Sequence, residues 1–178
     1  MEKLLNINDM IVDKRFQRKD VKFKGIFKVI KIEKFTEDND KFYVEDVADG
    51  DRMYYMTFSL KEAIDNGTVT MFKKPEKPEL EINSKAMLNP DYQGFFTQNP
   101  EYKIYVLTDK YLDWLYFECD GDETEMLDHL EKYDFGMDHS DLESVLGVYM
   151  DKVTGTDMIY RVDQHLRKIE KGKISVNG

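Results

Sequence analysis

The sequence lacks the residues and motifs from which most small enzymes and metal modules are recognised. Cys119 is the single cysteine, so neither an intramolecular disulfide nor a cysteine-rich zinc module can form. The 3 histidines (His129, His139 and His165) form no HxxxH or HExxH pair. GxSxG, GxGxxG and P-loop motifs are also absent. We therefore expect a protein that is not an enzyme, with no catalytic residues, no metal and no cofactor.

Long apolar runs are also missing. The N-terminal segment MEKLLNINDMIV is short and is interrupted by Asn6, Asn8 and Asp9, so it resembles neither a membrane span nor a signal peptide. Together with the lone cysteine, this predicts a reducing, cytoplasmic environment (the host cytoplasm if a phage encodes the protein). Apolar residues make up 41% of the 178 residues, which is enough to fill a core, so we expect a folded chain.

The net charge of −10 is distributed unevenly along the chain. Residues 1–80 hold 16 basic and 16 acidic side chains, whereas residues 81–178 hold 10 and 20 and so carry the whole excess. The density of negative charge is highest in residues 118–143, where eleven carboxylates accompany one lysine, Lys132. Such asymmetry between the halves of a chain bears on its partners rather than on its fold.

The N-terminal half has the pattern of short antiparallel strands. Residues 21–35 alternate as a long strand whose phase slips at Val29–Ile30, which indicates a bulge, with Gly25 allowing a bend. Further strands are predicted over 41–47, 53–59 and 68–72, with a hairpin turn at Asp49–Gly50 and a helical turn over 60–67. This order predicts a small β-barrel-like part of the SH3-like or OB-like kind.

The C-terminal half is predicted to be mixed and mainly helical. We expect a strand over 101–107. The apolar run at 112–118 suits either a buried strand or a short buried helix, and we favour a strand that pairs with 101–107. Helices are expected over 122–133, from a Ser140–Glu143 capping box to Gly155, and over 159–169. The predicted class is therefore α+β. Its predicted parts are a barrel-like region (1–74), a linker or crossover (75–81) and an acidic strand-plus-helix region (82–178) packed against the first.

The acidic segment allows four interpretations: a metal site, a catalytic acid/base pair, a polyanion mimic or a solvated face. A calcium loop from Asp120 to Glu131 would have Glu125 at the position that requires glycine, and the apolar spacing there predicts a helix. Acid/base catalysis requires two carboxylates held in one cleft, which abundance does not provide. As a continuous helix, the segment would carry one carboxylate per roughly 3.5 Å, close to one phosphate per about 3.4 Å of a nucleic-acid strand.

These observations predict a non-enzymatic inhibitor or adaptor of the type carried by phages and mobile elements. Its acidic helical surface would dock on the basic, nucleic-acid-binding groove of a host nuclease or other defence protein. The predicted partner-binding residues are the carboxylates Asp120, Asp122, Glu123, Glu125, Asp128, Glu131, Asp134, Asp138, Asp141 and Glu143.

Four alternatives are also compatible with the sequence. One is a barrel that binds single-stranded nucleic acid through Lys22, Lys24, Lys28 and Tyr54. Another is an enzyme or nucleotide-binding protein with an unrecognised site. The basic and acidic parts of different copies would also be able to join in a homodimer. Finally, the acidic face would serve only solubility if it is merely a solvated surface.

Overall fold

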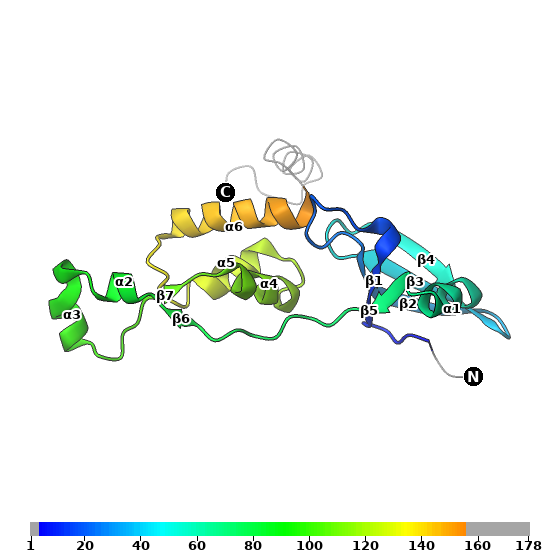
Figure 1. Ribbon diagram of the computed structural model, residues 1–178, viewed down its shortest axis with the longest axis horizontal. Helices are drawn as coiled ribbons and strands as arrows, with labels where there is room; N and C mark the ends of the chain where they lie inside the picture. Colours follow the sequence, from blue (N-terminus) through cyan, green and yellow to red (C-terminus); the bar gives the residue numbers. More distant parts are fainter. Residues whose placement is uncertain (1–3, 156–178) are drawn as a thin grey trace, which may run out of the picture. The chain divides into compact units, whose positions relative to one another are not determined.

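The computed structural model describes residues 4–155, which divide into two compact units (Figure 1). The sheet unit comprises the described residues up to Phe72 together with those from Met150 onward, and the helical unit comprises Lys73–Tyr149. A five-stranded antiparallel sheet forms the first unit, and short helices dominate the second. The predicted α+β class is therefore confirmed. No helix within residues 4–155 is long and apolar enough to span a bilayer.

The sheet has the strand order β4-β3-β2-β1-β5, with all neighbouring strands antiparallel. Its strands are β1 (Met10–Asp13), β2 (Ile26–Thr36), β3 (Asn39–Asp46), β4 (Arg52–Met56) and β5 (Val69–Met71). Helix α1 (Thr57–Asp65) connects β4 to β5. Because β4 and β5 are the two edges of this sheet, the predicted barrel-like part is an open sheet and not a closed barrel.

The predicted phase slip in β2 is confirmed as a β-bulge at Ile30. Val29 pairs with Val44 and Lys31 pairs with Tyr43, which leaves Ile30 as the extra residue between them. An extra residue reverses the facing of every side chain beyond it, and so it restores Ile32 to the core side. The core of the sheet unit includes Leu5, Ile11, Phe27, Val29, Phe42, Val44, Tyr55, Leu60, Ala63 and Val69.

Residues 21–25, which the alternation assigns to the long strand, form turns at 22–25 and only an isolated bridge between Val21 and Arg18. They follow η1 (Lys14–Phe16) and precede β2. Gly25 has φ +88, and a Cβ there would lie 2.8 Å from the backbone nitrogen of Gln17, so the two backbones approach closely. The prediction was wrong here because Val21 and Phe23 are buried, which reproduces the in-out pattern of a strand.

The first half of the helical unit consists of short elements. These are β6 (Glu81–Ile82), α2 (Ser84–Met87), η2 (Pro90–Tyr92), α3 (Gln93–Gln98) and β7 (Tyr105–Val106). The strand predicted over 101–107 is therefore reduced to β7. It pairs with β6, so the predicted pairing of 101–107 with 112–118 was wrong.

Residues 112–118 lie in helix α4 (Asp109–Glu118), whereas the sequence pattern favoured a strand. Thr108 caps the helix by accepting a hydrogen bond of 3.2 Å from the backbone N–H of Tyr111. The buried side chains of α4 are Tyr111, Leu112, Leu115, Tyr116 and Phe117. A helix buried over so wide a face has a nearly continuous apolar run, which periodicity does not distinguish from a buried strand.

Two helices confirm the helical pattern beyond residue 120. Helix α5 (Glu123–Leu130) lies within the predicted 122–133, and α6 (His139–Thr154) ends before Gly155 as predicted. Met126 and Leu130 on α5 are buried, as are Leu142, Leu146 and Tyr149 on α6, each set at helical spacing. The boundary between the two units falls within α6. The helix predicted over 159–169 lies outside the described residues.

Candidate functional site

The predicted partner-binding carboxylates lie on α5, on the first turns of α6 and in the adjoining loops. In chain order they are Asp120 and Asp122 before α5, Glu123, Glu125 and Asp128 on it, Glu131, Asp134 and Asp138 between the helices, and Asp141 and Glu143 on α6. All are exposed except Glu123 and Asp134, which are half-buried. Folding therefore leaves most of this negative charge at the surface of the helical unit.

Three of these carboxylates form helix caps. Asp122 accepts hydrogen bonds of 3.0 and 3.1 Å from two backbone amides in the first turn of α5. Asp138 accepts a bond of 2.8 Å from the amide of Asp141, whose own carboxylate accepts one of 3.3 Å from the amide of Asp138. This reciprocal pair replaces the predicted Ser140–Glu143 capping box. The three carboxylates therefore have structural roles that require no partner.

His139 joins acidic residues from α5 and α6. Its Nδ1 contacts the carboxylate of Glu131, and its Nε2 lies 2.7 Å from that of Glu143. Hydrogen bonding to Glu131 first, and then to Glu143, raises the pKa of His139 above its ordinary value. The His139 side chain is 60% exposed, so this cluster lies at the surface. It places Glu131 and Glu143 next to each other and offsets their repulsion when the imidazole is protonated.

Glu125 and Asp128 have neither of these internal roles. Both are exposed on α5 and lie three residues apart. Within the part of the chain that the structure describes, no lysine or arginine forms an ion pair with either of them. Their charges are therefore accessible to a basic partner.

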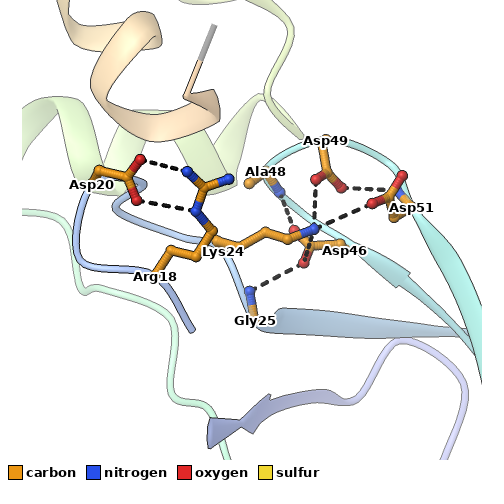
Figure 2. A network of polar contacts seen from close by, with 8 residues as sticks. All are labelled: Arg18, Asp20, Lys24, Gly25, Asp46, Ala48, Asp49 and Asp51. Carbon is orange, nitrogen blue, oxygen red and sulfur yellow. Dashed lines mark hydrogen bonds and ion pairs between the residues drawn. The ribbon is translucent and has the colours of Figure 1, made fainter. Parts of the chain in front are cut away.

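Among the predicted nucleic-acid-binding lysines, Lys24 lies inside an ion cluster at the turn after β3 (Figure 2). Its Nζ is 2.5 Å from Asp49 and 3.3 Å from each of Asp46 and Asp51. Burial alone would lower the pKa of Lys24, whose side chain is 16% exposed, but these carboxylates outweigh it and raise the pKa. Lys24 therefore stabilises the turn and does not present its charge to a ligand.

The other predicted nucleic-acid-binding residues lie in two places. Lys22 is in the turns before β2, where its backbone amide donates a hydrogen bond of 2.9 Å to Lys152. Lys28 is on β2 opposite Glu45, and Tyr54 is on β4 opposite Tyr43. Since Phe42 and Val44, the neighbours of Tyr43, face the core, Tyr43 and its cross-strand partners lie on the outward face of the sheet. The structure thus brings Lys28 and Tyr54 to one face, without Lys22 or Lys24.

The acidic segment also contains residue types that are suited to metal or thiol chemistry. Within residues 4–155, no group of three or more His, Cys, Asp or Glu residues is arranged to hold a metal ion. Most of the possible calcium loop from Asp120 to Glu131 is helical, because α5 begins at Glu123. Burial, followed by the charge of Glu125 and other carboxylates, raises the pKa of the Cys119 thiol. Cys119 is thus held in its protonated, less nucleophilic form.

The sequence pattern did not indicate a buried polar cluster around Asp13. The Asp13 side chain is 0% exposed and accepts hydrogen bonds from the hydroxyl of Tyr55 at 2.5 Å and from Arg15 at 3.0 and 2.7 Å. Burial alone would raise the pKa of Asp13, but the bonds from Arg15 and Tyr55 outweigh it and lower the pKa. Sequence reasoning missed this cluster because Tyr55 is distant from Asp13 in the sequence.

No family model, curated protein or solved structure matches this chain. Its function is therefore inferred from its own residues. Two surfaces contribute: the exposed carboxylates of α5 and α6 in the helical unit, and the outward face of β2, β3 and β4 in the sheet unit.

Proposed function

We propose that the chain is a non-enzymatic binding protein whose acidic helical surface docks on a basic, nucleic-acid-binding groove of a partner protein. The observation that carries this proposal is the charge density along α5. With the flanking residues Asp122 and Glu131, α5 has five carboxylates in ten residues. At the helical rise this is one charge per about 3 Å, comparable to one phosphate per about 3.4 Å of a nucleic-acid strand.

This concentration of charge is unfavourable in the free protein. Glu125, Asp128 and Glu131 follow one another at i, i+3 spacing, and each such like-charge pair destabilises a helix by a few tenths of a kcal/mol. A groove lined by lysine and arginine removes that repulsion and steers the approach of the two proteins. Affinity for such a groove should decrease strongly as salt is added.

The partner class that fits this surface is a protein that holds nucleic acid through its phosphates, because such a groove presents the required counter-charge. A host nuclease or another defence protein is of this kind. The chain then acts as an inhibitor or adaptor of the phage or mobile-element type, and occupies the groove in place of nucleic acid.

Two charge reversals of equal size test this proposal. The first, Glu125→Lys with Asp128→Lys, alters exposed carboxylates of α5 that neither cap a helix nor contact His139. The matched control, Glu62→Lys with Asp65→Lys, alters two exposed carboxylates at the same spacing on α1. Both variants change the net charge equally, so a difference between them reports on the position of the charge.

The wild type and both variants are immobilised and exposed to an extract of the native host cell, and the bound proteins are identified by mass spectrometry. We expect the wild type and the α1 variant to retain a nucleic-acid-binding protein that duplex DNA and added salt both displace, and the α5 variant to lose it. Equal retention by both variants, or a bound protein that DNA does not displace, would contradict the proposal.

A further inference from the structure

The outward face of β2, β3 and β4 carries aromatic rings that the core does not require. Tyr54 is 52% exposed and Phe35 is 57% exposed. Tyr43 lies opposite Tyr54 on the neighbouring strand, with ring centroids 5.8 Å apart. The other face of the same strands, with Phe42, Val44 and Tyr55, already fills the core. Exposed rings gathered on one sheet face indicate a binding surface.

Ammonium groups lie beside each of these rings. Lys41 lies between two of them, with Nζ 4.7 Å from the centroid of Phe35 and 5.1 Å from that of Tyr54. Lys31 has its Nζ 5.3 Å from the centroid of Tyr43. Each of the three rings therefore has a cation within the distance of a cation–π contact.

The cations of this face outnumber its carboxylates. Lys28 and Arg52 lie on either side of Glu45 in the strand register. Glu45 is ion-paired with Arg52 at 3.1 Å, and Glu33 with Lys31 at 2.9 Å. All four paired side chains are at least 36% exposed, and such pairs contribute little free energy, so an incoming phosphate can compete for the cations. The net charge of the face is therefore positive, although that of the whole chain is negative. Its cations are Lys28, Lys31, Lys41 and Arg52, and its carboxylates are Glu33 and Glu45.

We propose that this face binds single-stranded nucleic acid. Unpaired bases stack on Tyr54, Tyr43 and Phe35, and the phosphates between them are held by Lys31, Lys41 and Arg52. Sheet faces with exposed aromatic side chains are a recurrent platform for unstacked bases, and stacking of this kind accepts any base. A duplex hides its base faces and gains only the electrostatic part of the interaction.

The presence of rings and cations on the same face favours nucleic acid over an acidic peptide as the ligand. A nucleic-acid strand supplies both bases for the rings and phosphates for the cations, whereas an acidic peptide would use the cations and leave the rings exposed. This inference is independent of the docking function of α5, because it concerns different residues in the other unit.

Fluorescence anisotropy with a short, labelled oligo(dT) at low salt tests the proposal, with single substitutions and matched controls. Tyr54→Ala removes a stacking ring, and Phe58→Ala removes a ring that is 74% exposed on α1, outside the face. Lys41→Ala removes a cation of the face, and Lys61→Ala removes an exposed lysine of α1. Phe35→Ala is a second aromatic variant in case Tyr54→Ala does not fold, and circular dichroism checks each fold.

We expect Tyr54→Ala or Phe35→Ala to weaken oligo(dT) binding about fivefold to a hundredfold, the range found for loss of one stacked base. Lys41→Ala should weaken binding and reduce the slope of log affinity against log salt by about 0.7 for the lost phosphate contact. Phe58→Ala and Lys61→Ala should change neither quantity. The proposal is overturned if oligo(dT) does not bind, if the face variants and controls behave alike, or if a hairpin duplex or an acidic peptide binds as tightly.

Discussion

The hydroxyl of Tyr55 on β4 donates a hydrogen bond of 2.5 Å to the carboxylate of Asp13 at the end of β1. Arg15 donates to both oxygens of the same carboxylate, which has no exposed surface. A buried carboxylate is tolerated only when its charge is paired and hydrogen-bonded. Arg15 supplies the opposite charge, and Arg15 and Tyr55 together supply the hydrogen bonds. The hydrogen bond between Tyr55 and Asp13 joins β4 and β1, which are not neighbours in the sheet.

Tyr55→Phe removes one of these hydrogen bonds without creating a cavity. Because the acceptor is charged and buried, we expect the free energy of unfolding to decrease by about 1.5–3 kcal/mol, measured by urea denaturation. Tyr54→Phe is the matched control, since Tyr54 is the exposed neighbour, and we expect it to stay within about 0.5 kcal/mol of wild type. Equal effects at the two positions would show that the buried bond contributes nothing.

The same substitution should alter stability in acid. Asp13 has a lowered pKa in the folded protein, so its ionisation stabilises the fold above the unfolded pKa of about 3.9, and this contribution is lost as the pH falls through the folded pKa. Tyr55→Phe removes a bond that lowers the pKa. The difference in unfolding free energy between wild type and variant should therefore be largest near neutral pH and decrease below a pH of about 4. A difference that does not vary between neutral and acid pH would contradict this.

Lys24→Met should destabilise the sheet unit. It leaves the fully buried carboxylate of Asp46 with backbone hydrogen bonds from Gly25 and Ala48 but without the ammonium group of Lys24. We expect a loss of about 2–3 kcal/mol by chemical denaturation, below the roughly 3–5 kcal/mol of a fully buried pair because Lys24 retains some exposure. Lys61→Met, on the surface of α1, should change stability by less than about 0.5 kcal/mol. A small effect at Lys24 would mean that solvent screens the cluster.

Gly25→Ala and Gly67→Ala separate backbone strain from steric overlap. Both glycines have a positive φ, but an added Cβ meets nothing within 4 Å at Gly67 and lies 2.8 Å from the backbone of Gln17 at Gly25. We expect Gly67→Ala to lower the melting temperature by an amount consistent with about 1–2 kcal/mol. Gly25→Ala should lower it clearly more, because backbone atoms must also move. Similar melting temperatures for the two variants would refute the close approach at Gly25.

His139 should make stability dependent on pH near neutrality. Its pKa is raised in the folded protein, so its contribution is fully present below the unfolded pKa of about 6.5 and is lost as the pH rises through the folded pKa. The melting temperature of wild type relative to His139→Gln should therefore decrease from acid to alkaline pH. His129, whose pKa burial lowers, has the opposite dependence but is present in both proteins. Parallel melting curves across this range would exclude the contribution.

Features that depend on nearby residues were predictable from the sequence. The bulge at Ile30 follows from a change of alternation within one strand, and the helices α5 and α6 follow from apolar residues three and four positions apart. Helix α4 was not predictable, because its buried residues form a run compatible with either type of element. The turns at residues 22–25 were missed because burial of Val21 and Phe23 imitates the alternation of a strand.

The candidate surfaces also differ in whether they depend on residues that are near or distant in the sequence. Local spacing was sufficient to locate the dense carboxylates of α5 and to show that most of them lie on polar positions of a helix. It gave no means of knowing that Lys24 is enclosed by carboxylates more than twenty residues away, or that Lys41 lies between Phe35 and Tyr54. Those relationships arise when strands pair across turns, and the register of that pairing is set by the packing of the whole core and not by any short stretch of chain.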